Sequence, residues 1–184
     1  MEYNSIEEYK RRKAFALEYG TLLGISWIVV FAAYVCGIRT MNPLLMLACY
    51  LGFAVLLFLP FYFVLRFKNK HTDACQPITY VQALHFSILM FSYAIVLTGL
   101  AEYIYFAFID NGAVFDSLLS FINNPEFDKT LNELSMQDMK QMMADNIETM
   151  RSVSPLDLTF SLMHLNVTTS LVLMFIVAAV MKKS

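Results

Sequence analysis

The chain has 184 residues and a formal net charge of −2, and 58% of its residues are hydrophobic while only 15% are charged. An ordinary soluble domain is about 45–50% apolar and about 25% charged, so this composition is typical of a membrane protein. It excludes a basic surface for nucleic acid, because the few cations flank apolar runs and do not form a patch of their own.

Four long apolar runs follow one another along the chain. They cover Ala14–Gly37, Pro43–Leu65, Thr79–Ile109 and Leu156–Met181. Each reaches the ~20 residues with which an α-helix crosses a hydrocarbon core of ~30 Å. We therefore predict one all-α domain over residues 1–184, an integral membrane four-helix bundle. The first run is too long for a signal peptide and has no small-residue cleavage site, so we expect it to stay in the membrane.

The first span carries the motif Gly20-x-x-x-Gly24. Two glycines one helical turn apart let the backbone of a second helix approach closely. The simplest partner is the second or the fourth span of the same chain. Dimerisation through this face is the alternative, so the sequence leaves open whether the protein forms a homo-oligomer.

The Lys and Arg residues are divided unequally between the two sides of these spans, nine against four. The richer side holds Lys10–Lys13, Arg66, Lys68, Lys70, Lys182 and Lys183. Basic segments next to membrane spans stay in the cytoplasm. We therefore expect a multi-pass protein with both the N and the C terminus cytoplasmic and with residues 110–155 on the outer side.

Residues 110–155 are acidic, with eight carboxylates against three basic residues. Asn123-Asn124-Pro125 breaks the chain, so we expect Asp116–Ile122 to be a short helix or an extension of the third span. Ser135-Met136-Gln137-Asp138 has the spacing of a capping box, and Ser154-Pro155-Leu156-Asp157 is a start signal for the last span. A helical outer loop between spans three and four is predicted.

Apolar residues recur at three- and four-residue steps after the predicted capping box. They are Met136, Met139, Met143, Ile147 and Met150. This spacing predicts an amphipathic helix. Its apolar face either lies on the membrane or on the ends of the spans, or forms an adaptable surface for a protein partner. A copper site is also conceivable, but helical spacing explains the methionines without a metal, and we expect no cofactor.

Glu102 in the third span and His164 in the fourth lie at matching depth, roughly 10–12 Å below the outer ends of their helices. Ionisable residues inside a membrane are costly and mark functional sites. Ser161, Asn166 and Thr168 add polar groups near His164, which predicts a polar cavity between spans three and four. Three readings stay open: a structural hydrogen bond joins Glu102 to His164, the cavity takes a headgroup, a proton or a small ligand, or the two residues never meet.

Several short motifs occur in a recognisable order. They are Tyr19-Gly20-x-x-x-Gly24, Ile78-Thr79-Tyr80-x-Gln82-Ala83-Leu84, Tyr103–Ile109, Asn124-Pro125-Glu126-Phe127 and Ser154-Pro155-Leu156. Their order resembles a family of membrane proteins of Bacteroidota, domain of unknown function family 4199. The resemblance covers nearly the whole chain and implies four helices in the bacterial inner membrane. It implies no activity, and it associates the chain with polyprenyl-phosphate glycosyltransferases and envelope genes.

The sequence has no nucleophile–base arrangement, nucleotide-binding loop or HExxH metal motif, so we do not expect an enzyme. Our first hypothesis is a non-enzymatic accessory or scaffold subunit of a cell-envelope complex. Its partner would be another membrane protein, such as the glycosyltransferase that the resemblance associates with it. The alternative is a small transporter or lipid-handling protein that uses the polar cavity between spans three and four.

Overall fold

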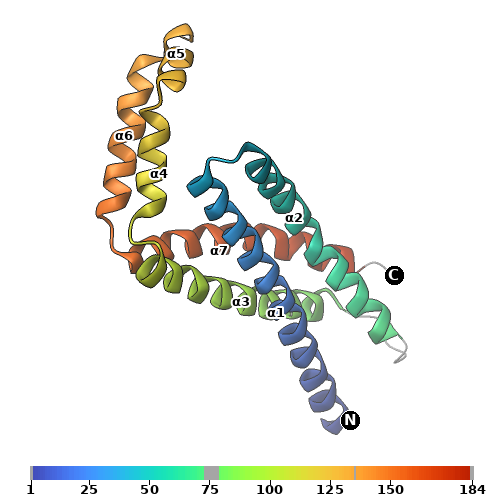
Figure 1. Ribbon diagram of the computed structural model, residues 1–184. Helices are drawn as coiled ribbons and strands as arrows, with labels where there is room; N and C mark the ends of the chain where they lie inside the picture. Colours follow the sequence, from blue (N-terminus) through green and yellow to red (C-terminus); the bar gives the residue numbers. More distant parts are fainter. Residues whose placement is uncertain (1, 73–78, 135, 183–184) are drawn as a thin grey trace.

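The four apolar runs form four long helices in the computed structural model, which describes residues 2–72, 79–134 and 136–182 (Figure 1). Every regular element within these ranges is helical. In chain order the elements are α1 (Glu2–Thr40), α2 (Pro43–Thr72), α3 (Tyr80–Ile104), the π-helical turn η1 (Tyr105–Ile109), α4 (Ala113–Ile122), α5 (Pro125–Glu133), α6 (Gln137–Ser152) and α7 (Pro155–Lys182). The predicted all-α class is confirmed.

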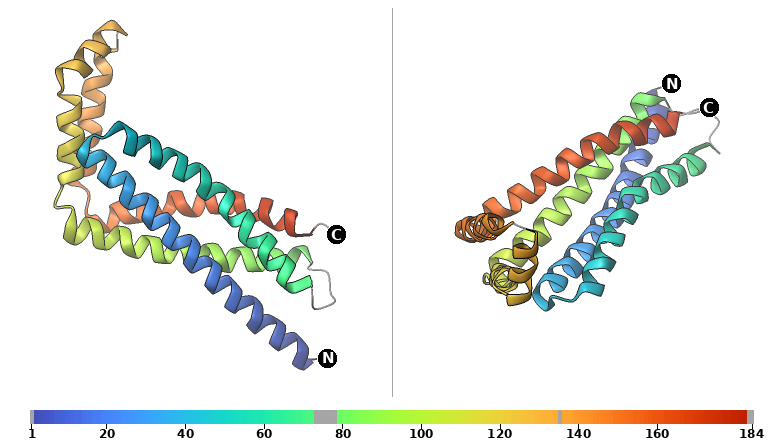
Figure 2. Two further views of the ribbon diagram at one scale, coloured as in Figure 1. Left: turned by 45° about the vertical axis from the view of Figure 1, so that its right-hand side comes forward. Right: turned by 90° about the horizontal axis from the view of Figure 1, so that it is seen from above.

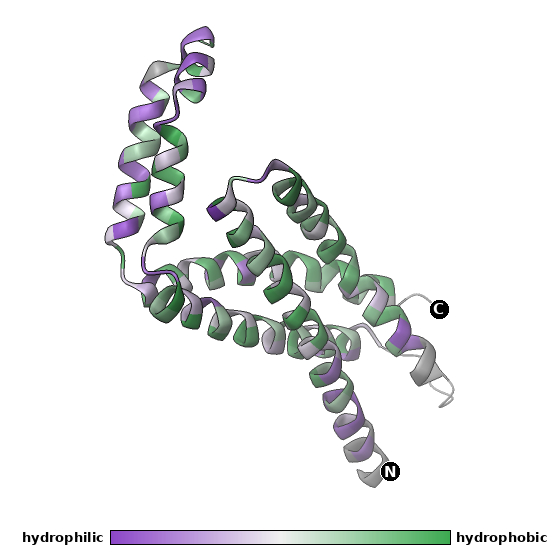
Figure 3. Cartoon of the chain, in the orientation of Figure 1, coloured by the Kyte–Doolittle hydropathy of each residue, from purple (hydrophilic) through white to green (hydrophobic). Residues whose placement is uncertain are grey.

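The stretches long and apolar enough to cross a membrane are Tyr9–Thr40, Pro43–Lys68, Tyr80–Ile109 and Pro155–Val180. They agree with the four predicted spans and differ from them by a few residues at the ends. Figure 3 shows the division: apolar residues cover the four spans, whereas polar residues gather at the beginning of α1 and on the α4–α6 segment.

Side-chain caps set the beginnings of three spans. The Oδ1 atom of Asn42 accepts a hydrogen bond from the amide of Leu44 at the start of α2. Thr79 and Gln82 form a reciprocal capping box at the start of α3. The Ser154 hydroxyl oxygen accepts from the amide of Asp157, as the start signal predicted for the last span requires.

The spans do not pack evenly. α1 lies against α2 and α3, and α7 lies against α3, while α2 meets α7 only over a short part of its length. We call the end of the bundle from which α4–α6 extend the outer end. Figures 1 and 2 show that α2 and α7 come together near the opposite, inner end and diverge towards the outer end, and that both chain termini lie at the inner end.

The glycine motif of the first span packs within the molecule, but against α3. A Cβ atom at Gly20 would lie 2.5 Å from the carbonyl oxygen of Met90, and one at Gly24 would lie 3.2 Å from Cα of Ala94. The prediction of an intramolecular contact is confirmed, whereas the predicted partner, span two or four, is wrong. The motif marks a close approach of two backbones, but it contains no information about which helix approaches.

The inner half of the bundle is filled with aromatic side chains. The rings of Phe67 and Phe86 stack with centroids 4.2 Å apart, and those of Tyr19 and Phe63 stack at 5.1 Å. These four residues belong to the main core cluster, which joins α1, α2, α3 and α7. Aromatic packing therefore joins the inner ends of α1, α2 and α3, and α7 completes the core with Met174, Val177 and Ala178.

The outer segment is a helical hairpin that turns across the ends of the spans, as the two views of Figure 2 show. α4 is the short helix expected before the Asn123-Asn124-Pro125 break, and α5, which the sequence analysis did not predict, follows it. Two ion pairs fasten α6: Arg151 to Asp116 of α4 at 3.0 Å, and Lys140 to Asp128 of α5 at 2.6 Å.

The capping box predicted for α6 involves Ser135, which lies outside the described residues. The helix begins at Gln137, and its N-cap residue is Met136, which makes no side-chain capping bond. The amphipathic helix itself is confirmed over Gln137–Ser152.

Candidate functional site

A cavity of about 700 Å³ lies between the spans in the outer half of the bundle. All four spans line it, not only the third and fourth as predicted, and Val114 of α4 contributes at the outer end. The position follows from the fold: the aromatic core closes the inner half, while the divergence of α2 and α7 leaves space in the outer half (Figure 2).

The walls of the cavity are mainly apolar and aromatic. On α1, Trp27, Phe31 and Tyr34 follow one another at four- and three-residue steps and therefore share one face of the helix. On α2, Phe53 and Leu57 repeat this spacing. The cavity is thus a hydrophobic space with only a few polar groups in its walls.

The principal polar group is the carboxyl of Glu102 on α3. Its side chain is 4% exposed, and the side chain of Asn166 on α7 donates a hydrogen bond to it. The second carboxyl oxygen, Oε2, has no hydrogen-bond partner among the described residues. Thr98, one turn before Glu102, also lines the cavity, and its hydroxyl donates to the carbonyl oxygen of Gly24 at 3.4 Å.

A half-satisfied carboxyl is a costly feature at this position. An unpaired buried acceptor costs about 1–3 kcal/mol, and ionisable groups within membrane spans are rare unless they serve a function. Since Glu102 also lines a cavity, its free oxygen is available to a molecule in that space.

A cluster of polar residues holds α4 over the outer end of the cavity. The Asp110 side chain, 2% exposed, accepts hydrogen bonds from the hydroxyl of Tyr105 at 2.7 Å and from the amide of Val114 at 3.2 Å. Arg39 at the end of α1 also hydrogen-bonds to Tyr105. Three elements, α1, η1 and α4, are therefore tied together where the cavity ends.

The π-helical turn η1 places Tyr105 in this cluster. The amide of Asp110 donates to the carbonyl of Tyr105 at 2.9 Å, the five-residue hydrogen bond of a π-turn. The Tyr105 ring then meets Phe31 edge to face at 5.6 Å. Such turns often occur at functional sites, and this one begins three residues after Glu102.

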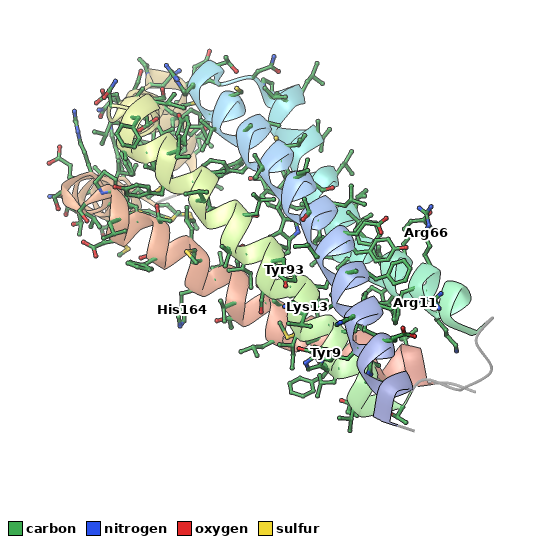
Figure 4. All side chains as sticks on the ribbon, turned by 90° about the horizontal axis from the view of Figure 1, so that it is seen from below. Tyr9, Arg11, Lys13, Arg66, Tyr93 and His164 are labelled. Atoms are coloured by element: carbon green, nitrogen blue, oxygen red, sulfur yellow. The ribbon has the colours of Figure 1, made fainter. Side chains whose placement is uncertain are left out.

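The structure brings only part of the predicted polar site together. Glu102 and Asn166 meet in the cavity, but Ser161, His164 and Thr168 are exposed on α7. Figure 4 shows His164 pointing away from the bundle. Of the three readings that the sequence left open, the structure therefore shows the one in which Glu102 and His164 do not meet.

Helical geometry explains why Asn166 faces the cavity while His164 and Thr168 do not. At about 100° per residue, Asn166 lies about 200° around the helix from both His164 and Thr168. When Asn166 faces the cavity, these two residues must face outward. The hydroxyls of Ser161 and Thr168 instead donate to the carbonyl oxygens of Asp157 and His164 in their own helix.

The predicted partner surface on α6 divides into two parts. Met136, Met139 and Met150 are exposed, while Met143 and Ile147 are half-buried on a helix that packs against α4 and α5. No contact with another molecule tests this surface, so its role as a partner surface stays a prediction.

Four residues of the cavity wall were not predicted from the sequence: Thr98 and the aromatic residues Trp27, Phe31 and Tyr34. Two signals were present: Thr98 lies one turn from Glu102, and the three aromatic residues share a helical face. Neither signal distinguishes a cavity wall from a lipid-facing surface, because both surroundings are apolar.

Four long apolar helices, an inner half closed by an aromatic-rich core and a mainly hydrophobic cavity with one buried carboxyl define a multi-pass α-helical membrane protein with an internal cavity.

The family model described as "Protein of unknown function (DUF4199)" matches residues 18–183, and the chain belongs to this family. The match begins within the first span and covers the other three spans, the residues that line the cavity and the outer hairpin. Comparison with curated proteins and with solved structures gives no match.

Proposed function

We propose that this protein binds an amphiphile from the surrounding membrane in its cavity, as the lipid-handling alternative anticipated. The observation that carries the proposal is the half-satisfied Glu102 carboxyl in the wall of an otherwise hydrophobic cavity of about 700 Å³. Pockets that bury a drug-sized ligand measure about 300–1,000 Å³ and combine apolar walls with a few placed polar groups.

An opening between α2 and α7 supports direct entry from the bilayer. Leu57 of α2 and Leu165 of α7 both line the cavity, yet they are 46% and 63% exposed. An apolar chain can therefore pass between the diverging helices without crossing water. Its transfer from lipid into the cavity needs little desolvation, so selectivity depends on the polar end of the molecule.

We further propose that the protein resides in the bacterial inner membrane with both termini cytoplasmic. The unequal distribution of Lys and Arg supports this orientation, and both termini lie at the same end of the bundle, as a shared side of the membrane requires (Figure 1). The cavity then lies in the outer leaflet. The proposed role is binding or transfer of a lipid without a chemical reaction.

Two alanine-to-tryptophan substitutions on α2, one in the cavity wall and one outside it, test this function. Ala54→Trp fills the cavity from its wall, whereas Ala48→Trp adds the same bulk at an exposed position outside the lining. Each protein is purified from its native membrane in mild detergent and examined by native mass spectrometry. We expect a bound lipid on the wild type and on Ala48→Trp, and its loss from Ala54→Trp. Equal lipid retention by both variants would contradict the proposal.

A second candidate function is the accessory subunit, which the outward polar residues of α7 favour. Ser161, His164 and Thr168 are exposed in the outer half of a membrane span, where polar side chains seldom face lipid. A partner helix, from a glycosyltransferase or another membrane protein, would cover them. Affinity purification with His164→Leu beside the wild type tests this: the variant should lose a stoichiometric membrane partner, and an unchanged set of co-purifying proteins would count against the role.

A further inference from the structure

We infer that the amphiphile carries a hydroxyl at the end that meets Glu102, so the ligand class is a lipid alcohol whose contacting polar group is neither a phosphate nor a carboxylate. This inference rests on the proposed function and adds the chemistry of the polar end. Three observations at the cavity support it: the free acceptor, the absence of cations in the lining, and the apolar surroundings.

The free acceptor is Oε2 of Glu102. Asn166 already donates to the carboxyl, and Oε2 has no partner among the described residues although the side chain is 4% exposed. A carboxyl oxygen needs a hydrogen-bond donor. A hydroxyl supplies one, whereas an ester or an ionised phosphate supplies none.

The described residues that line the cavity include no Lys, Arg or His. Arg39, at the outer end of α1, hydrogen-bonds to Tyr105 outside this lining. An anionic headgroup beside Glu102 would thus be desolvated and would face a carboxyl without a compensating cation. Burial of an unpaired charge is strongly unfavourable, so phosphates and carboxylates are excluded from this position.

A hydroxyl supplies the donor to Oε2 without bringing a further charge into the cavity, and the rest of the molecule stays apolar. The chain of the alcohol then lies among Trp27, Phe31 and Leu57. The same hydroxyl chemistry can come from an aliphatic alcohol or from a phenol with an alkyl chain. The aromatic walls accommodate either, so the test includes both.

Ligands that share one alkyl chain and differ in the polar group show how binding depends on that group. Delipidated wild-type protein is titrated with hexadecanol, hexadecylphenol, hexadecanoic acid, hexadecyl phosphate and hexadecane, and the apparent Kd of each is measured by native mass spectrometry. We expect one of the two hydroxyl compounds to bind at least about tenfold more tightly than the alkane, the acid and the phosphate. The better of the two identifies the aliphatic or the phenolic source.

Substitution of the carboxyl tests whether the selectivity arises at Glu102. In Glu102→Leu the preferred hydroxyl compound should lose about tenfold in affinity, about 1.4 kcal/mol, and approach the alkane, whose affinity should not change. Glu102→Gln keeps a carbonyl acceptor and should retain most of the preference. Glu18→Leu removes an exposed carboxyl on α1 and serves as the matched control.

The outcomes separate this inference from the proposed function. Equal affinity for all five compounds, or tightest binding of the phosphate or the acid, would overturn the alcohol while leaving amphiphile binding in place. If none of the compounds binds, the proposed function itself fails. The titration of the wild-type protein with the five ligands tests the inference even if Glu102→Leu yields no folded protein.

Discussion

Glu102 of α3 and Asn166 of α7 join two neighbouring spans through a side-chain hydrogen bond in the wall of the cavity. The pair fixes the rotation of α7, because a helix that presents Asn166 inward must present His164 outward. It also holds the carboxyl in place while leaving Oε2 unpaired. One contact therefore serves both the packing of the spans and the proposed site.

Loss of the amide should destabilise the bundle more than loss of both polar groups. Asn166→Leu removes the donor to Glu102 and leaves a less satisfied buried carboxyl, which costs about 1–3 kcal/mol. The double variant Glu102→Leu/Asn166→Leu replaces both partners by apolar groups and should recover most of this loss. Thermal unfolding in detergent gives the Tm of the wild type and of the two variants, and Asn166→Leu should have the lowest Tm. A double variant as unstable as Asn166→Leu would show that the hydrogen bond does not determine stability at this position.

The contact between α1 and α3 predicts that Gly20 tolerates no side chain. A Cβ atom there would lie 2.5 Å from the Met90 carbonyl oxygen and 2.8 Å from the Tyr93 Cβ. Backbone atoms cannot move aside easily, so Gly20→Ala should lower the unfolding free energy by about 1–3 kcal/mol.

Gly37 provides the matched control for this prediction. A Cβ atom at Gly37 meets the flexible Met46 side chain, at 3.3 Å from its sulfur. Gly37→Ala should be neutral or stabilising by up to about 1 kcal/mol, because alanine has the higher helix propensity. Urea unfolding of the detergent-solubilised proteins gives both values, and equal destabilisation by the two substitutions would contradict the close approach of α1 and α3.

Asp110 should determine how firmly α4 covers the cavity. Asp110→Ala removes the acceptor for Tyr105 and for the Val114 amide, so α4 should open more often. Hydrogen exchange followed by mass spectrometry should show faster exchange over Ala113–Ile122. Asp116→Ala is the control, because it breaks an ion pair whose side chains are 48% and 57% exposed, and such pairs contribute about 0–1 kcal/mol. If the two variants exchange at similar rates over Ala113–Ile122, the hydrogen bonds to Asp110 do not hold α4 in place.

The proposed orientation predicts which side of the membrane each end of the bundle faces. Met142 is exposed on α6 and Glu7 is exposed near the beginning of α1. In a background with Cys36, Cys49 and Cys75 replaced by Ser, a membrane-impermeant maleimide should label Met142→Cys in intact spheroplasts. Glu7→Cys should react only after permeabilisation. The reverse pattern would invert the topology and place the cavity in the inner leaflet.

Residue chemistry along the chain was sufficient to predict the four spans, a helical outer segment and Glu102 as a candidate site residue. Length and apolar content define a span, and the cost of burying a carboxyl in a membrane identifies Glu102 as a special position. The sequence could not predict how each span rotates about its axis. In a soluble helix, polar residues mark the outside, but a membrane span has apolar residues on both its lipid-facing and its packed sides.

The unknown rotation of the spans explains why the sequence left the Glu102–His164 contact open and why it predicted the wrong partner for the glycine motif. The polar side chains of α7 extend around much of the helix, and nothing in their order indicates that Asn166 faces inward while His164 faces outward. Gly20 and Gly24 likewise require a close neighbour without specifying α3. The cavity has no sequence signal of its own, because it arises where α2 and α7 diverge.

The most direct test of amphiphile binding is photocrosslinking in the native membrane. Leu57 in the cavity wall and Leu51 on the exposed surface of α2 outside the lining are each replaced by the photoreactive p-benzoylphenylalanine. After illumination, mass spectrometry identifies the attached lipids. We predict that position 57 captures one lipid class that position 51 does not. The same mixture of bulk phospholipids at both positions would contradict a selective binding site in the bundle.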